Sequence, residues 1–344
     1  MEKKVLNENK EFKDVEIIRM DNNENPYGTS EHVLKAVKDN IDFISNYPAL
    51  NFPDLKTKIA QECSIESENI SIAPGSVSFI DYMLKTFVSN DENVVIPKIS
   101  FVAYKLLAER YDVPNKIAEM KNYKIDLEAV FALVDDKTRV VFLANPNNPT
   151  GTIFSHDEIY SILKKISPNV YVVIDEAYVE YVKDESFPKS LELFKEFNNV
   201  IVLRSFSKAY GLAGLRIGYA ISHPENIAKL EKCRVPFSII NVASIAASQA
   251  LDDKDFLEYS VENNSKQRAM LFQNLIDLGF KVVPSQGNFI FIHFKNCAQR
   301  DEIHNKLKLN GLYTKKMDQF GDEKSLRITV GNSHSNKKII QTLS

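Results

Sequence analysis

The sequence predicts an α/β protein with a large domain and a smaller α/β C-terminal domain. The large domain is expected to hold a mostly parallel sheet with helices on both faces. Short, fully apolar runs alternate with helical patterns, which is typical of a parallel sheet that is covered on both sides. The length of 344 residues also exceeds what a single hydrophobic core usually fills, so we expect a second domain.

The elements of the large domain follow one another in a regular order. Thr29 or Ser30 is predicted to cap a first helix, and Pro53 suits the first turn of a second helix. Five apolar runs then indicate strands, with helical patterns between them at 76–89 and 157–166. The runs are ISIA (70–73), NVVIP (93–97), VVFLA (140–144), YVVIDEA (171–177) and VIVLRS (200–205).

The pattern changes after about residue 250. A long helical pattern at 252–278 precedes two short apolar segments, NFIFIHF and SLRITVG, which indicate a smaller α/β domain. We expect the boundary to lie in the helix near 240–255. The predicted division is an N-terminal segment (1–30) that packs with the small domain, a large domain (31–245) and a small domain (246–344).

Composition excludes several classes of function. The net charge is −3 with acids and bases interspersed, so no nucleic-acid partner is expected. The polar start and the lack of an apolar run near 18 residues predict neither a signal peptide nor a membrane span. Three widely spaced cysteines favour reduced thiols in a cytoplasmic protein, and the six histidines lack metal-ligand spacing.

Polar side chains follow three of the predicted strands, at the edge where ligands bind in such sheets. They are Asn148 after the third strand, Asp175 and Tyr178 at the end of the fourth, and Ser205, Ser207 and Lys208 after the fifth. Near Gly75 and Ser76, a strand leads into a helix whose free N–H groups suit a phosphate. Singly, each motif has a structural explanation, such as a turn, an N-cap or a solvated lysine. Their joint occurrence at one edge favours a binding site.

Five motifs in this order carry a family resemblance. They are NNENPYG (22–28), PNNPTG (146–151), DEAY (175–178), SFSK (205–208) and LRITVG (326–331). Together they resemble the fold-type I aminotransferases that depend on pyridoxal 5′-phosphate, and most closely the histidinol-phosphate aminotransferases. The resemblance extends over nearly the whole chain.

The resemblance implies which residues hold the pyridine ring of the cofactor. Lys208 matches the lysine that links covalently to the cofactor and later moves a proton at the substrate's Cα. Asp175 matches the acid that keeps the ring nitrogen protonated. Tyr178 and Asn148 match the residues that hydrogen-bond the phenolic oxygen, and Phe101 matches the aromatic residue that stacks on the ring.

The resemblance also implies a phosphate clamp and a shared active site. The clamp would consist of Ser205, Ser207, Arg216 and the backbone N–H groups of Gly75, Ser76 and Val77. Arginine suits this place because its planar fork binds phosphate in a bidentate manner. Tyr47 matches a tyrosine that reaches the cofactor of the neighbouring subunit, which implies a homodimer.

Substrate recognition departs from the family pattern. Asn25 and Arg327 match substrate-binding positions, but Lys315 stands where the family has a second arginine, and lysine offers phosphate only a point charge. The usual G-[AS]-D-E start of the phosphate-binding helix is GSVS here. A short N-terminal extension also lacks the family's tyrosine pattern.

The function implied is amino transfer from glutamate to a small phosphorylated ketone or aldehyde. Imidazole acetol phosphate, which gives histidinol phosphate, is the family's acceptor. Dihydroxyacetone phosphate, which gives serinol phosphate, is a rival because of Lys315. Two alternatives stay open: decarboxylation of a phosphorylated amino acid, and a cofactor-binding regulator, which would need a DNA-binding segment.

Overall fold

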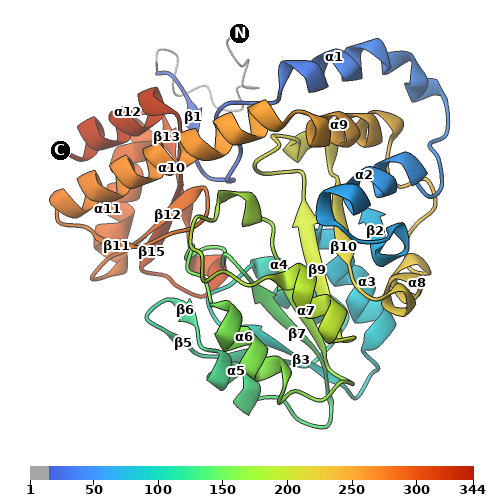
Figure 1. The fold of residues 1–344 in the computed structure, drawn as a ribbon. Helices are drawn as coiled ribbons and strands as arrows, with labels where there is room; N and C mark the ends of the chain where they lie inside the picture. Colours follow the sequence, from blue (N-terminus) through green and yellow to red (C-terminus); the bar gives the residue numbers. More distant parts are fainter. Residues whose placement is uncertain (1–14) are drawn as a thin grey trace.

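The computed structural model describes residues 15–344 and is built around a seven-stranded sheet (Figure 1). Its strands, in spatial order, are β2 (Ile70–Ala73), β10 (Gly218–Ile221), β9 (Val200–Ser205), β8 (Tyr171–Asp175), β7 (Thr138–Ala144), β3 (Asn93–Pro97) and β4 (Asn115–Ala118). All neighbouring pairs are parallel except those of β10, which is antiparallel to both β2 and β9. The predicted mostly parallel α/β sheet is therefore confirmed.

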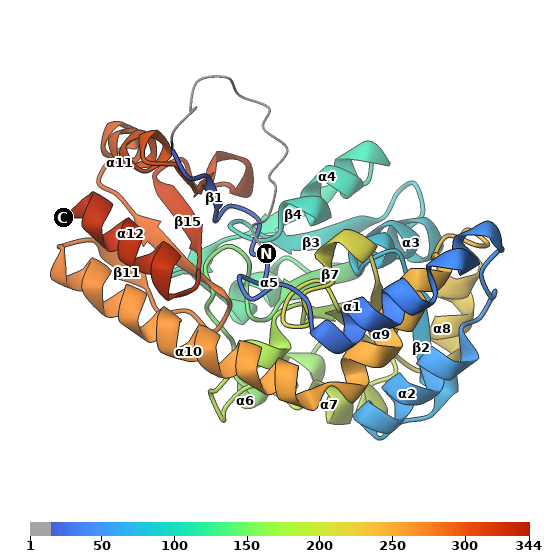
Figure 2. The same ribbon diagram turned by 90° about the horizontal axis from the view of Figure 1, so that it is seen from above.

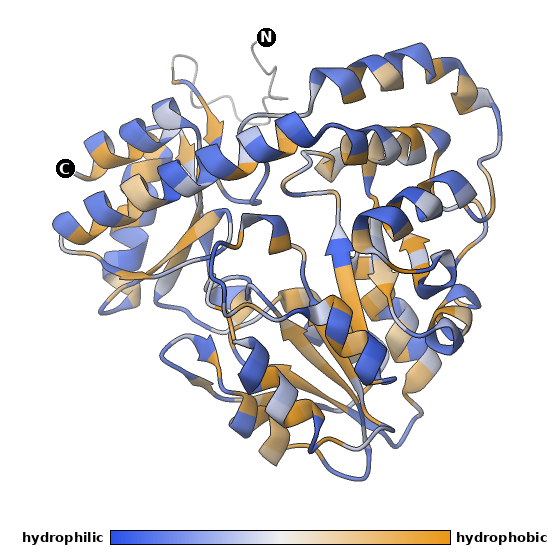
Figure 3. Cartoon of the chain, viewed as in Figure 1, coloured by the Kyte–Doolittle hydropathy of each residue, from blue (hydrophilic) through white to orange (hydrophobic). Residues whose placement is uncertain are grey.

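Helices cover both faces of this sheet. One face packs on α3 (Val77–Phe87), α4 (Val102–Arg110) and α8 (Pro224–Glu231). The other packs on α2 (Pro53–Cys63), α5 (Leu127–Ala132), α6 (His156–Leu163), α7 (Ser190–Glu196) and α9 (Asn241–Asp252). Strand alternation divides the two cores, because Ile201 and Leu203 of β9 face the first set while Val200 and Val202 face the second. Figure 3 shows β9 as hydrophobic along most of its length.

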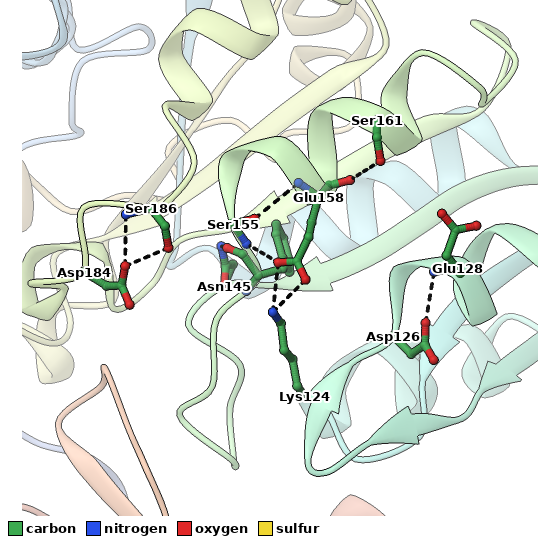
Figure 4. A network of polar contacts seen from close by, with 10 residues as sticks. Lys124, Asp126, Glu128, Asn145, Ser155, Glu158, Ser161, Asp184 and Ser186 are labelled. Atoms are coloured by element: carbon green, nitrogen blue, oxygen red, sulfur yellow. Dashed lines mark hydrogen bonds and ion pairs between the residues drawn. The ribbon is translucent and has the colours of Figure 1, made fainter.

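Side-chain caps fix where several helices begin. The hydroxyl of Ser30 accepts hydrogen bonds from the backbone at the start of α1 (Glu31–Asp39), so Ser30 is the cap of the two predicted. Ser155 and Glu158 form a capping box at the start of α6. Lys124, in the hairpin of β5 (Met120–Lys121) and β6 (Lys124–Ile125), donates to Glu158 at 2.7 and 2.9 Å (Figure 4).

The C-terminal part contains a four-stranded antiparallel sheet. Its strands, in spatial order, are β11 (Lys281–Val283), β12 (Phe289–His293), β15 (Ser325–Thr329) and β14 (Lys315–Lys316). Three helices accompany it: α10 (Lys254–Asp277), α11 (Cys297–Leu309) and α12 (Ser333–Leu343). Figure 2 shows α10 leading from α9 along this part of the molecule, and Leu271 and Leu275 of α10 pack in its core.

The start of the described chain joins the C-terminal part. β1 (Ile18–Arg19) pairs in parallel with β13 (Leu312–Tyr313), and Met20 is buried in the core of the four-stranded sheet. This pairing supports the predicted packing of the N-terminal segment with the small domain, although the domain limits at 30 and 245 stay a prediction. The short 3₁₀ helices are η1 (Ile41–Ser45), η2 (Ser67–Asn69), η3 (Val179–Tyr181), η4 (Ala213–Leu215) and η5 (Asp318–Phe320). Among residues 15–344, no helix is long and apolar enough to cross a bilayer.

Candidate active site

A cavity of about 440 Å³ opens where β7, β8 and β9 end. Residues from the N-terminal segment and from the C-terminal sheet complete its wall. Most of the predicted site residues line it: Ser76, Val77, Phe101, Asn148, Asp175, Tyr178, Ser205, Ser207, Lys208, Arg216, Lys315 and Arg327. Residues that are far apart in the sequence therefore meet in one space, as the strand-end argument predicts.

Strand alternation decides which polar side chains reach the cavity. Asp175 follows the face of β8 that packs on α3 and α4, whereas Glu176 lies on the opposite face. There Glu176 forms an ion pair with Arg204, with Nη2 and Oε2 2.8 Å apart. Of these two adjacent carboxylates, only that of Asp175 is available to a ligand in the cavity.

Asp175 is a buried carboxylate with two hydrogen-bond donors. The hydroxyl of Tyr104 donates to Oδ2 at 2.8 Å, and the N–H of Ala177 donates to Oδ1 at 3.2 Å. Burial raises the pKa of Asp175 to about 6, against the effect of these hydrogen bonds. A cation beside Asp175 would stabilise its charged form, and a protonated pyridine nitrogen is such a cation.

Tyr104 is a functional neighbour that the sequence did not reveal. It is fully buried and stacks on Phe142, with ring centroids 4.9 Å apart. It lies one helical turn after Phe101, and the two rings meet edge to face at 5.6 Å. The tyrosine thus links the aromatic ring in the cavity wall to the carboxylate of Asp175.

The amine of Lys208 lies in the cavity wall and donates to the carbonyl of Asn22 at 3.1 Å. Its Nζ is 5.6 Å from the ring centroid of Tyr178. Burial lowers the pKa of Lys208 to about 7, and the positive charges of Arg327 and Arg216 act in the same direction. A large fraction of Lys208 is therefore neutral and nucleophilic near pH 7.

An anion cradle lies at the start of α3. No hydrogen bond occupies the N–H groups of Ser76 and Val77 within the described part of the chain. Gly75 has a φ of 79°, and a Cβ there would collide with the guanidinium of Arg216. A Cβ on Gly218 would lie 2.5 Å from the nitrogen of Ser76. Backbone donors and Arg216 thus converge at a helix N-terminus, which suits a phosphate group.

Arg327 on β15 is held from two sides. Its Nη1 donates to Oδ1 of Asn148 at 2.5 Å, and its Nη2 donates to the carbonyl of Asp21 at 2.6 Å. The rings of Phe289 and Phe320 each lie 5.6 Å from its guanidinium carbon. The guanidinium is thereby fixed in orientation before any substrate arrives.

Lys315 is the cross-strand neighbour of Arg327 in the register of β14 and β15. Side chains that are paired in this way project from the same face of a sheet, and both residues line the cavity. The next residue, Lys316, instead forms an ion pair with Asp301 at 2.7 Å. The cavity therefore has two adjacent cations at its C-terminal wall.

Three predicted site residues do not line the cavity. The N–H of Gly75 donates to the carbonyl of Ala73 at 2.7 Å, so it is not free to bind a phosphate, and the predicted role of this residue as a backbone donor is wrong. The amide of Asn25 donates to the carbonyl of Ala209 at 2.9 Å and to Ser260 at 2.8 Å, so it braces the backbone beside Lys208. Tyr47 is 84% exposed, away from the cavity of its own chain. The predicted lack of an N-terminal tyrosine concerns an extension whose residues 1–14 lie outside the described range.

The family model "Aminotransferase class I and II" matches residues 15–343. The chain belongs to this aminotransferase family. A curated relative, histidinol-phosphate aminotransferase 1 of Mannheimia succiniciproducens, is 36% identical over 327 residues, which cover 95% of this chain and 89% of the relative. The enzyme is thus a fold-type I, pyridoxal-phosphate-dependent aminotransferase similar to histidinol-phosphate aminotransferases.

Solved structures share the fold of this aminotransferase. Histidinol-phosphate aminotransferase from Sinorhizobium meliloti, in complex with pyridoxal-5′-phosphate, has a TM-score of 0.88 at 24% identity, covering 96% of this chain and 90% of that one. L-threonine-O-3-phosphate decarboxylase from Porphyromonas gingivalis has a TM-score of 0.82 at 22% identity, covering 95% and 98%. At these identities the likeness concerns the fold alone.

Proposed function

We propose that this aminotransferase transfers an amino group between glutamate and a small phosphorylated ketone. The observation that carries the proposal is the pair of cations, Lys315 and Arg327, in the same cavity as Lys208. Transamination alternates two anionic partners in one site, and two adjacent cations can hold a carboxylate or a phosphate. The candidate acceptors are imidazole acetol phosphate and dihydroxyacetone phosphate.

The residues of the cavity divide the work of this reaction. Bound pyridoxal phosphate supplies a sink for the electron pair that remains when the substrate's Cα loses its proton. Lys208 anchors the cofactor and then moves the proton at Cα through its freed Nζ. Asp175 holds the proton of the ring nitrogen. The other roles we propose are Tyr178 and Asn148 at the phenolic oxygen, Phe101 on the ring face, and Ser76, Val77, Ser205, Ser207 and Arg216 at the phosphate.

We expect the smaller acceptor to be used at least as well as imidazole acetol phosphate. Lys315 places a compact charge where the family's arginine would make a bidentate contact, so the distal site should discriminate less between phosphorylated ketones. The measurement is kcat/KM for a panel of phosphorylated ketones and aldehydes with glutamate as donor. A preference for imidazole acetol phosphate of about a hundredfold or more, roughly 2.7 kcal/mol, would contradict this expectation.

Two matched variants test whether Lys315 holds the phosphate. Lys315→Met should lower kcat/KM for phosphorylated acceptors by about 10- to 100-fold, since charged hydrogen bonds contribute roughly 1.5–3 kcal/mol. Lys316→Met removes the same charge from the next residue, whose side chain pairs with Asp301, and should have little effect. The same assays distinguish the decarboxylase alternative, which would release carbon dioxide from a phosphorylated amino acid without an acceptor.

An exposed apolar surface supports the proposed homodimer. Its residues surround the loop that carries Tyr47: Ile41, Phe43, Ile44, Tyr47, Leu50, Val235, Phe237 and Ile240. Ile44 is 70% exposed, and the ring of Tyr47 rests on Phe237 with centroids 5.0 Å apart. A patch of this kind is typical of an interface between subunits. In a dimer, Tyr47 would reach the phosphate of the partner's cofactor.

Ile44→Glu should convert the dimer into an inactive monomer. A charge in an apolar interface costs its desolvation without gaining a partner, and each separated site would lose the tyrosine that the partner supplies. Light scattering at assay concentration measures the change. Leu309→Glu is the matched control, because Leu309 is 67% exposed at the end of α11, outside this surface. A fully active monomer of the unaltered enzyme would refute the proposal.

A cytoplasmic location of the enzyme likewise stays a prediction.

A further inference from the structure

Three consecutive residues of the N-terminal segment contact three different side chains of the active site. The carbonyl of Asp21 accepts from Arg327 at 2.6 Å, and the carbonyl of Asn22 accepts from Lys208 at 3.1 Å. The side chain of Asn23 donates from Nδ2 to the hydroxyl of Tyr178 at 3.0 Å. In the first two contacts the N-terminal segment contributes a backbone carbonyl. Only in the third does it contribute a side chain, so the amino-acid sequence controls that contact directly.

Asn23 is itself fixed in place by the C-terminal sheet. It is 1% exposed, and its N–H donates to Oγ1 of Thr329 at 2.9 Å. Its carbonyl accepts from the amide of Asn288 at 3.1 Å. Its backbone has a φ of 54°, a left-handed conformation that asparagine tolerates better than most residues. The backbone of Asn23 is therefore held in place beside Tyr178.

The hydrogen bonds also determine which end of the Asn23 amide faces Tyr178. Oγ1 of Thr329 accepts from the backbone of Asn23, and its own hydrogen points to Oδ1 of Asn23 at 3.2 Å. Oδ1 is thus directed at Thr329, and Nδ2 is directed at Tyr178. Because the hydroxyl of Tyr178 accepts this hydrogen bond, its own hydrogen is free to point into the cavity that both residues line.

We propose that Asn23 is a positioning residue that turns the hydroxyl hydrogen of Tyr178 toward the phenolic oxygen of the bound cofactor. This inference rests on the role proposed above for Tyr178. Donation to that oxygen stabilises its anionic form, which lowers the pKa at the covalent link to Lys208. Thr329 lies two residues beyond Arg327 on β15, so the strand that binds the substrate's anion also sets the direction of this hydrogen bond.

The test is a pH titration of the visible absorption of the cofactor-loaded enzyme. Tyr178→Phe removes the donor and defines the full upward shift of the pH at the midpoint of this titration. We expect this shift to be about one pH unit or more. Asn23→Gly suits the left-handed backbone and removes only the amide, so it should give part of that shift. Asn23→Asp keeps the shape but accepts the tyrosine's hydrogen, so its shift should approach that of Tyr178→Phe.

A matched control separates the effect of the hydrogen-bond direction at Tyr178 from the effect of an added negative charge. Asn22→Asp adds the same negative charge at the cavity wall and leaves the contact between Asn23 and Tyr178 intact, so its shift should be clearly smaller than that of Asn23→Asp. The charged groups nearest Tyr178, which are Lys208, Arg327 and Asp175, are the same in all these variants. Equal shifts for the two aspartate variants, or none for Asn23→Gly, would overturn the inference.

A second readout needs no cofactor. Burial raises the pKa of the Tyr178 phenol, and the hydrogen bond from Asn23 lowers it, so Asn23→Gly should raise this pKa further in the cofactor-free enzyme. Carbon-13 signals of labelled tyrosine, assigned by their loss in Tyr178→Phe, report it. If Tyr178→Phe leaves the visible titration unchanged, the proposed role of Tyr178 fails. If it shifts while the Asn23 variants do not, only the present inference fails.

Discussion

Lys208→Ala should lower the rate of amino transfer by about 10⁴-fold or more, because general acid–base catalysis alone contributes 10²–10⁴ and the covalent anchor is lost as well. Loss of colour is not required, because the phosphate clamp at Ser76, Val77 and Arg216 can still hold free cofactor. Steady-state kinetics measures the loss. In the unaltered enzyme, borohydride reduction followed by peptide mapping should place the pyridoxyl group on Lys208, and a label on any other lysine would refute the assignment.

The pH dependence of cofactor attachment gives an independent check on Lys208. Its lowered pKa of about 7 means that the amine is neutral above pH 7 and protonated below it. Only the neutral amine is nucleophilic, so the rate of attachment to cofactor-free enzyme should rise with pH and level off above about 8. Rapid-mixing absorbance measures this rate. A midpoint near pH 10, as in an exposed lysine, would show that the site does not perturb Lys208.

Asp175→Asn should lower kcat by roughly 10³-fold or more, in line with the loss of one preorganised electrostatic partner. The amide has nearly the same shape but cannot stabilise the proton on the ring nitrogen, so the electron sink weakens while the phosphate clamp remains. Cofactor affinity should therefore fall much less than kcat. The measurements are turnover and a fluorescence titration with pyridoxal phosphate.

Glu176→Gln is the control for Asp175→Asn, since it neutralises the adjacent carboxylate on the opposite face of the sheet. It removes the charge that pairs with Arg204, so it should reduce the free energy of unfolding. Its effect on turnover should be small. Near-normal turnover in Asp175→Asn, or an equal loss in both variants, would show that the role of Asp175 has been misassigned.

The sequence predicted the buried strands well because their signal is local. The strands at 70–73, 93–97 and 200–205 have the predicted limits, since each is a mainly apolar run between polar turns. The strand predicted over 171–177 ends at Asp175, because the next residues turn away to form the cavity wall. β10 was missed, since its four residues, GYAI, follow a glycine-rich loop and pair antiparallel with both neighbours.

The polar residues at the strand ends were predictable for the same reason, whereas their partners were not. Tyr104 reads as an ordinary helix residue, and only the fold brings its hydroxyl to Asp175, 71 residues further on. Asn23 lies in the motif NNENPYG, which does not indicate its partner, and its contact with Tyr178 spans 155 residues. Such contacts depend on how two distant elements pack, for which a single sequence carries no periodic signal.

The N-terminal segment pairs with β13 and also bonds to β15 through Asn23 and Thr329. These contacts have a consequence for how the enzyme becomes active during its synthesis. Asn23 must wait for Thr329, which leaves the ribosome 306 residues later, before its hydrogen bonds can form. Large-domain strands up to β10 can pair earlier, because all their partners precede residue 222. The entropic cost of closing the loop between Asn23 and Thr329 grows only slowly with its length, but this closure is the last step to occur. A nascent chain could therefore hold a folded large sheet and still lack a competent catalytic centre.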